Sequence, residues 1–206
     1  MKILVVTHDI PYPLTHGAWL CVYHIFKKLA KKHGIFLLSF EDGIERTDGL
    51  TRLRQIFKNI YLIKSDKKRP SLRRYLYKVL SLNSGLIKRE EHPEVYQRFK
   101  EKIMELVISE NIDILHCTTL NMAEFGSDVK GCLKVLHIID SSTLEMKRRI
   151  SLQGKLGWYK KIYNLIWYRR IKNYERKMIS NFDICATGHH YLFCVDGAIL
   201  PDGICR

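Results

Sequence analysis

The chain opens with the stretch Ile3-Leu4-Val5-Val6-Thr7, which runs into the turn-forming residues Asp9-Ile10-Pro11-Tyr12-Pro13. A short, continuous apolar run that ends in turn residues is typical of a strand buried on both faces of a parallel sheet. A helical stripe follows from Gly17 and stops at His33-Gly34, and residues 35–40 form a second apolar run. The sequence therefore begins as strand, loop, helix and strand.

The same alternation continues along the chain. We expect helices near residues 51–57, 72–82 and 93–110, and strands at residues 60–64, 112–117 and 133–139. Strands that alternate with helices build βαβ units, whose parallel strands are covered by helices on both faces. The predicted fold is therefore α/β, a Rossmann-like open parallel sheet with helices on both faces.

The length, the composition and the absence of certain motifs exclude several classes of function. A chain of 206 residues with 46% hydrophobic content can bury one core. It has neither a G-x-G-x-x-G after the first strand nor a G-x-x-x-x-G-K-[ST], which argues against hydride transfer and nucleotide hydrolysis. The six cysteines are scattered without a C-x-x-C pair, so we expect reduced cytosolic thiols and no zinc site. No run approaches the roughly 20 apolar residues that span a bilayer.

The formal net charge of +14 is unevenly spread. Residues 64–78 and 147–177 hold most of the unbalanced Lys and Arg. A concentrated positive field attracts anionic partners, so we expect an anionic neighbour at one or both segments.

The loops that follow the strands hold the candidate ligand-binding residues. In open α/β sheets ligands bind at the carboxyl ends of the strands, which here are the loops at 9–17, 116–121, 140–143 and 188–191. In the first of them Gly17 begins a helix, whose N–H groups and dipole attract phosphate, and a glycine lets the phosphate approach the backbone. The alternative is that Gly17 only permits a turn.

Several segments carry a resemblance to a known family. They are Pro11-Tyr12-Pro13-Leu14-Thr15-His16-Gly17, Leu29-Ala30-Lys31-Lys32-His33-Gly34, Asp113-Ile114-Leu115-His116, Val135-Leu136-His137-Ile138-Ile139-Asp140, Tyr174-Glu175-Arg176, Phe182-Asp183 and Leu200-Pro201-Asp202-Gly203-Ile204. In this order they resemble the first half of family 4 glycosyltransferases of the GT-B fold, close to the sugar transferases of bacterial polysaccharide clusters. Ala18 stands where many members have a second glycine, and Asp202 stands where they have asparagine.

The resemblance implies a Rossmann-like acceptor-side domain at residues 1–200 and, at residues 201–206, the start of a linker to a donor-binding domain that is missing here. Such an enzyme transfers a sugar, as a hexosyltransferase does, from a nucleotide-sugar to a lipid-linked or polysaccharide acceptor of the cell envelope. It would be cytoplasmic and peripheral on the inner face of the membrane. We expect this half to bind no cofactor and no metal, and to be nearly inactive alone.

The resemblance also assigns site residues. It places Gly17 and His16 at the donor phosphate, makes Asp140 and His116 catalytic, and puts Thr118 and Ser141 at the acceptor. Family members often have a functional histidine two positions beyond His116, where this chain has Thr118. The alternatives are a loop role for His16, a core role for His116, and helix capping by Asp140. For Glu175 we expect a structural pairing with a Lys or Arg three or four residues away.

The segment 147–177 interleaves aromatic and basic residues, with Glu175 as its one acid. Such a helix can lie on an anionic membrane, with its rings at the headgroups and its cations above them. The expected membrane contacts are Trp158, Lys160, Lys161, Trp167, Arg169 and Arg170. In the alternative, the apolar residues Leu156, Tyr159, Ile162, Tyr163, Ile166 and Ile171 face the core.

Two other functions stay open. The chain can be an acceptor-binding or membrane-docking subunit that needs a separate donor-domain partner chain. It can also be a basic nucleic-acid-binding module, since basic and aromatic residues bind phosphates and stack on bases. The second is weaker, because the sequence contains no RNP motif and no helix-turn-helix spacing.

Overall fold

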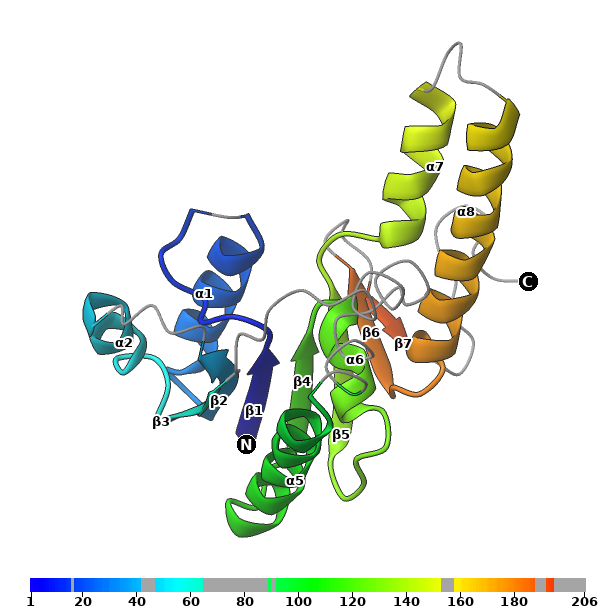
Figure 1. The fold of residues 1–206 in the computed structure, drawn as a ribbon. Coiled ribbons are helices and arrows are strands. Elements are labelled where there is room, and N and C mark those ends of the chain that lie inside the picture. The colour runs from blue at the N-terminus through cyan, green and yellow to red at the C-terminus, as the bar shows by residue number, and fades with distance from the viewer. Residues whose placement is uncertain are drawn as a thin grey trace.

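The structure of the 206-residue chain is a computed structural model that describes residues 1–15, 17–41, 47–64, 89, 92–152, 158–187 and 192–194. For residues 47–48 and 192–194 it describes the backbone alone. The described strands form one sheet, with helices on both of its faces (Figure 1). The predicted α/β class is confirmed.

The sheet is built from short apolar runs. Its strands are β1 (Lys2–Thr7), β2 (Gly34–Glu41), β3 (Asn59–Lys64), β4 (Ile114–Thr118), β5 (Leu133–Ile138), β6 (Ile184–Thr187) and β7 (Leu192–Cys194). They lie in the order β3-β2-β1-β4-β5-β6-β7. The first six are parallel, and their order is that of doubly wound, dinucleotide-binding-type sheets. The prediction of a parallel sheet needs one correction, because β7 pairs antiparallel with β6 at the edge.

Two layers of helices cover the sheet. They are α1 (Gly17–Leu29), α2 (Thr47–Leu53), α5 (Pro93–Ser109), α6 (Leu120–Gly126), α7 (Ser142–Leu152) and α8 (Trp158–Ile179). Val22 and Phe26 of α1 pack with Leu53 of α2 against one face of the sheet. Residues of α5 and α6, together with Met178 of α8, pack against the other face. Alternate residues of each strand point to opposite faces, so burial on both sides explains why β1 and β2 are apolar without interruption.

The predicted elements agree with the structure to within two residues for the first five strands, for the helix at 93–110 and for the start of α1. The helix expected at 51–57 begins earlier, at Thr47, and the basic segment 147–177 is not one helix but parts of α7 and α8. The helix expected at 72–82, the loop at 188–191 and the expected domain boundary near 200 lie outside the described residues.

Two aspartates of the resembling segments have structural roles. Asp113 accepts a hydrogen bond at 2.7 Å from the backbone N–H of Lys2, at the start of β1. Asp183 accepts one of the same length from the backbone N–H of Lys134 in β5. Both carboxylates satisfy donors at the amino ends of strands, which is the edge of the sheet opposite the expected ligand site.

Helices α7 and α8 run side by side and project beyond the end of the sheet (Figure 1). Every residue from Trp158 to Tyr163 is exposed, so the first turns of α8 lie outside the packed body. Among the described helices, none is both long enough and apolar enough to cross a membrane.

Candidate functional site

The strand order changes direction between β1 and β4. The chain leaves β1 toward β2 on one side, while β4 begins the series that continues to β5 and β6 on the other. The loops after β1 and β4 therefore diverge, and the crevice between them is where open α/β sheets bind ligands.

A cavity of about 150 Å³ occupies this position. Its lining comes from the end of β1, the start of α1 and the turn after β4: Thr7, His8, Asp9, Ala18, Trp19, Val22, Thr118, Thr119 and Asn121. We call it the switch-point cavity. Thr118, which the resemblance places at the acceptor, is part of its lining.

Three threonine hydroxyls in this lining lack hydrogen-bond partners among the described residues. Thr7 and Thr118 are each only 4% exposed, and with Thr119 they have buried Oγ1 atoms that form no hydrogen bond. Val6 lies beside Cys117 in the register, so Thr7 and Thr118 end neighbouring strands side by side. Buried polar groups are normally satisfied, and leaving one unpaired costs about 1–3 kcal/mol. The cluster therefore indicates a polar ligand or ordered water.

The backbone of Thr119 is strained. Its φ of 73° and ψ of 154° fall in a region that residues with side chains rarely adopt and that costs about 1–3 kcal/mol. Its N–H donates to the carbonyl of His137 at 2.8 Å, which ties the turn after β4 to β5. The strain is local to the cavity, and strained backbone of this kind clusters at ligand sites.

The start of α1 faces open space. A Cβ added to Gly17 would meet no atom within 4 Å, and Gly17 itself is exposed. Packing within the described residues therefore does not require glycine here, while the unpaired N–H groups of the first turn attract an anion. Ala18 and Trp19, the next residues of α1, line the cavity. His16, the other predicted phosphate contact, lies outside the described residues.

His8 and Asp9 add an imidazole and a carboxylate to the lining of the cavity. Nδ1 of His8 lies 2.8 Å from Oδ1 of Asp9, and both side chains are partly exposed. Neither residue is among the site residues predicted from the sequence. The signal was available, because both follow directly on the first strand.

His116 is not among the residues that line the cavity. Its ring packs edge-on against Phe26 at 5.0 Å and against His137 at 5.4 Å. Burial, together with the neighbouring His137, lowers the pKa of His116 to about 3, and burial also lowers the pKa of His137. Both rings are therefore neutral near pH 7, and both have a buried Nδ1 without a partner in the described structure. The catalytic role of His116 stays a prediction.

Asp140 and Ser141 follow the neighbouring strand, β5. Oγ of Ser141 accepts a hydrogen bond from the N–H of Leu144 at 3.2 Å, so Ser141 caps α7. The alternative in which Asp140 caps this helix is wrong. Asp140 is exposed, and its carboxylate makes no hydrogen bond to any described residue. Neither Asp140 nor Ser141 lines the switch-point cavity, and their catalytic and acceptor roles stay predictions.

Helices α7 and α8 form a projecting hairpin, and Glu175 connects the two helices at its base. Its side chain is only 2% exposed and accepts hydrogen bonds from the N–H of Thr143, at 3.2 Å, and from the Thr143 hydroxyl. The expected pairing with a Lys or Arg on the same helix is wrong, because the carboxylate points to the first turn of α7. A carboxylate is stabilised there by the helix dipole.

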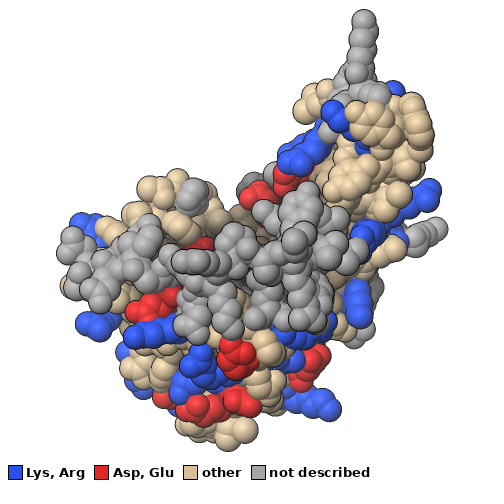
Figure 2. All heavy atoms as spheres, viewed as in Figure 1, with Lys and Arg blue, Asp and Glu red and all other residues tan. Residues whose placement is uncertain are grey.

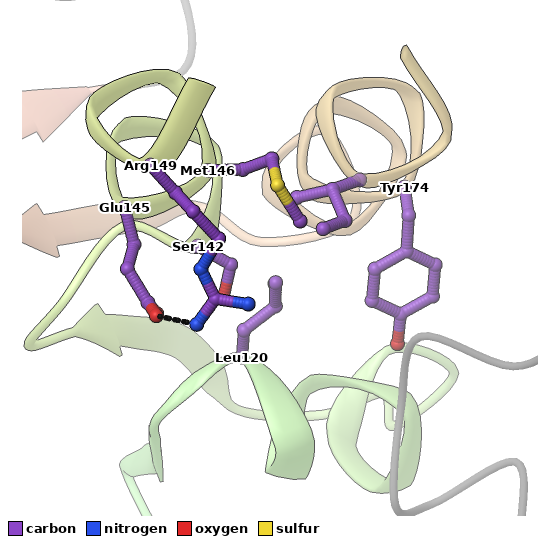
Figure 3. Close-up of a pocket in the computed structure, with 7 residues that line it drawn as sticks. Leu120, Ser142, Glu145, Met146, Arg149 and Tyr174 are labelled. Carbon is purple, nitrogen blue, oxygen red and sulfur yellow. Dashed lines mark hydrogen bonds and ion pairs between the residues drawn. The ribbon is translucent and has the colours of Figure 1, made fainter. Parts of the chain in front are cut away.

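A second hollow, of about 160 Å³, lies where α6, α7 and α8 meet. Leu120 of α6, Ser142, Glu145, Met146 and Arg149 of α7, and Ile171 and Tyr174 of α8 line it. In Figure 3 the side chains of Glu145 and Arg149 reach down from α7 toward Leu120, and Tyr174 stands on the opposite side. We call it the hairpin hollow.

The projecting end of the hairpin exposes large apolar side chains. Trp158 is 75% exposed and Leu152 is 83% exposed, and Tyr159, Ile162, Tyr163, Leu165 and Ile166 are also exposed. We call these seven residues the apolar tip. The alternative in which Tyr159, Ile162, Tyr163 and Ile166 face the core is wrong, because all four are exposed. Of its other two residues, Ile171 is partly buried and Leu156 lies outside the described residues. Soluble proteins rarely leave so many neighbouring apolar residues uncovered without an interaction role.

The predicted membrane contacts fall mostly on this surface. Lys160, Lys161, Arg169 and Arg170 are exposed, as Trp158 is. Trp167 is only partly exposed, because its ring packs on Tyr163 at 5.9 Å and Arg170 lies over it at 5.7 Å. On the face in Figure 2 the hairpin is tan and blue, and red side chains lie only toward its base.

No protein-family model matches the chain, and no curated protein matches it. Within the described residues no group of three or more His, Cys, Asp or Glu is placed to hold a metal ion.

The packing of the His116 ring against Phe26 and His137 predicts acid sensitivity. Because the folded protein lowers the pKa of His116 from its ordinary value of 6.5 to about 3, the unfolded chain binds a proton that the folded chain rejects between these values. Stability should therefore fall as the pH drops below 6.5. In urea unfolding from pH 6.5 to 4.5, His116→Leu should make this decline shallower by roughly 1 kcal/mol per pH unit. His24→Gln, at an exposed site, should not; equal slopes for all three proteins would contradict the assignment.

Proposed function

We propose that this chain is the acceptor-side domain of a GT-B-type glycosyltransferase that moves a sugar from a nucleotide-sugar to a lipid-linked or polysaccharide acceptor. The observation that carries the proposal is the switch-point cavity, where two almost fully buried threonine hydroxyls without partners lie beside the open first turn of α1. The reaction, sugar transfer from a nucleotide-sugar, is proposed from the resemblance of the sequence to family 4 glycosyltransferases.

The cavity suits the diphosphate of the donor. Sugar transfer releases a nucleoside diphosphate, so the site must stabilise negative charge as the glycosidic bond to the phosphate breaks. The N–H groups at Gly17 and Ala18 provide donors aligned with the helix dipole. The hydroxyls of Thr7 and Thr118 are donors that a phosphate oxygen would satisfy, which removes the penalty of leaving them unpaired.

The acceptor would approach from the side of β5. Asp140 lies just after β5 and has an exposed carboxylate, which can accept a hydrogen bond from a hydroxyl of the acceptor. In this proposal the contacts to the base and ribose of the donor fall to a second domain or partner chain, as in the family that the sequence resembles. No metal is needed, because helix N–H groups and hydroxyls provide the donors.

The hairpin would place the domain at an anionic membrane surface, on the cytoplasmic side. The apolar tip gives side chains that can enter the boundary between headgroups and acyl chains. Between Glu145 and Glu175 the sequence has no acidic residue, and each Lys or Arg near an anionic surface contributes about 1 kcal/mol. Apolar exposure and unopposed positive charge thus occur on the same projecting element.

Nucleotide binding tests the proposal without requiring turnover. Titration with UDP, ADP and GDP should detect weak binding of at least one through its diphosphate, because the base and ribose would contact a second domain. Thr118→Val should weaken this binding about tenfold, as expected for one lost hydrogen bond to a charged group. Thr118→Val should not destabilise the fold, because it replaces a buried unpaired hydroxyl with a methyl group. Absence of binding by all three nucleotides would contradict the proposal.

Thr187→Val is the matched control. Thr187 also has a buried Oγ1 without a partner, but it does not line the cavity. The substitution should leave nucleotide affinity unchanged. An equal loss of affinity in both variants would mean that the effect of Thr118→Val is not local to the cavity.

Vesicle binding tests the membrane surface. The chain should sediment with vesicles that contain phosphatidylglycerol and much less with pure phosphatidylcholine. The triple change Trp158→Ser, Ile162→Ser and Ile166→Ser should abolish sedimentation, because it removes three large side chains of the apolar tip without touching buried residues. Ile108→Ser, at a 77% exposed site on α5, is the control and should have no effect.

Three outcomes would contradict the proposed contact between the hairpin and an anionic membrane: equal binding to both vesicle types, binding that survives the triple change, or no binding to either vesicle type. Salt-dependent binding of oligonucleotides without vesicle binding would instead favour the nucleic-acid-binding alternative.

A further inference from the structure

The hairpin hollow combines an apolar floor with a polar wall. Leu120, Met146 and Ile171 supply the apolar part, and Ser142, Glu145 and Arg149 supply polar side chains from one helix. Ser142, Glu145 and Arg149 are three and four residues apart along α7, so they lie on the same face of the helix (Figure 3). A ligand in the hollow would therefore meet hydrophobic contact on one side and hydrogen-bonding groups on the other.

The charge in the hollow is balanced. Nη2 of Arg149 lies 3.3 Å from Oε1 of Glu145, and among the described residues these two are the charged ones that line the hollow. The surrounding segment, from Met146 to Tyr174, has only basic charged residues, so a neutral hollow within it is a local exception. An anion would have to compete with the Glu145 carboxylate for the guanidinium, which argues against a phosphate in this place.

The same pair suits an uncharged ligand with many hydroxyls. Arg149 offers N–H donors and Glu145 offers acceptor oxygens, so one hydroxyl can accept from the first and another can donate to the second. A sugar ring has hydroxyls at its edge and a face of C–H groups, and that face can pack on Leu120, Met146 and Ile171. A flat aromatic ligand or an alkyl chain would leave the ion pair without added hydrogen bonds.

The hairpin hollow lies close to the ends of strands β4 and β5. Its residue Ser142 begins α7, two positions after Asp140, and its residue Leu120 begins α6, directly after Thr119 of the switch-point cavity. The apolar tip stands at the other end of the same hairpin. The hollow is therefore between the surface proposed to face the membrane and the strand ends proposed to bind the donor.

We infer that the hairpin hollow is a binding subsite for an uncharged glycosyl unit of the acceptor. That the bound sugar belongs to the acceptor rests on the proposed function. That the hollow binds an uncharged sugar rests on the residues of the hollow alone. Ser142, Glu145 and Arg149 bind the ring hydroxyls, and the apolar floor packs against the ring. The subsite selects neutral sugars over sugar phosphates and sugar acids.

Simple glycosides provide the probes. Methyl glucopyranoside, galactopyranoside and mannopyranoside, in both anomers, would be titrated into ¹⁵N-labelled protein, and amide shifts would be followed by NMR. At least one glycoside should bind with a millimolar dissociation constant and shift the amides of Ser142, Glu145, Arg149 and Ile171. Arg149→Met should weaken this binding at least about fivefold, the worth of one hydrogen bond.

Arg148→Met is the matched control, because Arg148 is exposed on the same helix and does not line the hollow. It should leave the glycoside affinity unchanged. The inference is overturned if none of the glycosides shifts these amides, if both arginine variants lose affinity equally, or if inorganic phosphate or glucuronate binds the hollow more tightly than the glycosides.

Failure of this inference is distinguishable from failure of the proposed function. If a nucleoside diphosphate binds at the switch-point cavity but no glycoside binds at the hairpin hollow, only the proposed subsite is overturned. Glycoside binding at the hollow in a protein that binds no nucleotide would overturn the proposed sugar transfer and keep the hollow as a sugar-binding site.

Discussion

The parallel pairing of β1 with β4 is the constraint on which the candidate site depends. It brings the ends of two strands together although more than 100 residues separate them in the sequence, and their connections leave in opposite directions. The threonine hydroxyls at these ends cannot join the ladder of the sheet, and the described structure offers them no other partner. The fold thus creates a polar cavity where these two strand ends meet.

A second constraint fixes the hairpin to the sheet. The carboxylate of Glu175 is buried against the first turn of α7, where it bonds to Thr143. A buried charge is tolerated only when it is paired or hydrogen-bonded, so this contact holds α7 and α8 in one arrangement at their base. Beyond it the helices have little to pack on, and the apolar tip stays exposed. Rigid at the base and uncovered at the end, the hairpin is suited to contact a surface outside the domain.

The sequence predicted the α/β class and most strand positions, because apolar runs and turn residues are local signals. It placed Thr118 at the ligand edge because that edge follows from parallel strands. It did not predict the partner of Glu175, since Thr143 is 32 residues away and only the tertiary fold brings them together. It did not separate the core from the exposed surface of α8, where apolar residues occur on all sides and no periodicity marks a buried face. The split of 147–177 into two helices was missed although Gly154 and Gly157 are local signals for a break between helices.

The position of a bound nucleoside diphosphate tests the central claim most directly. A crystal structure of the protein with UDP, or with whichever nucleotide binds best, would locate the two phosphates. The phosphates should lie against the N–H groups of Gly17 and Ala18, with a phosphate oxygen within hydrogen-bonding distance of the Thr7 or Thr118 hydroxyl. Phosphates bound elsewhere on the basic surface, with the switch-point cavity holding only water, would contradict the central claim.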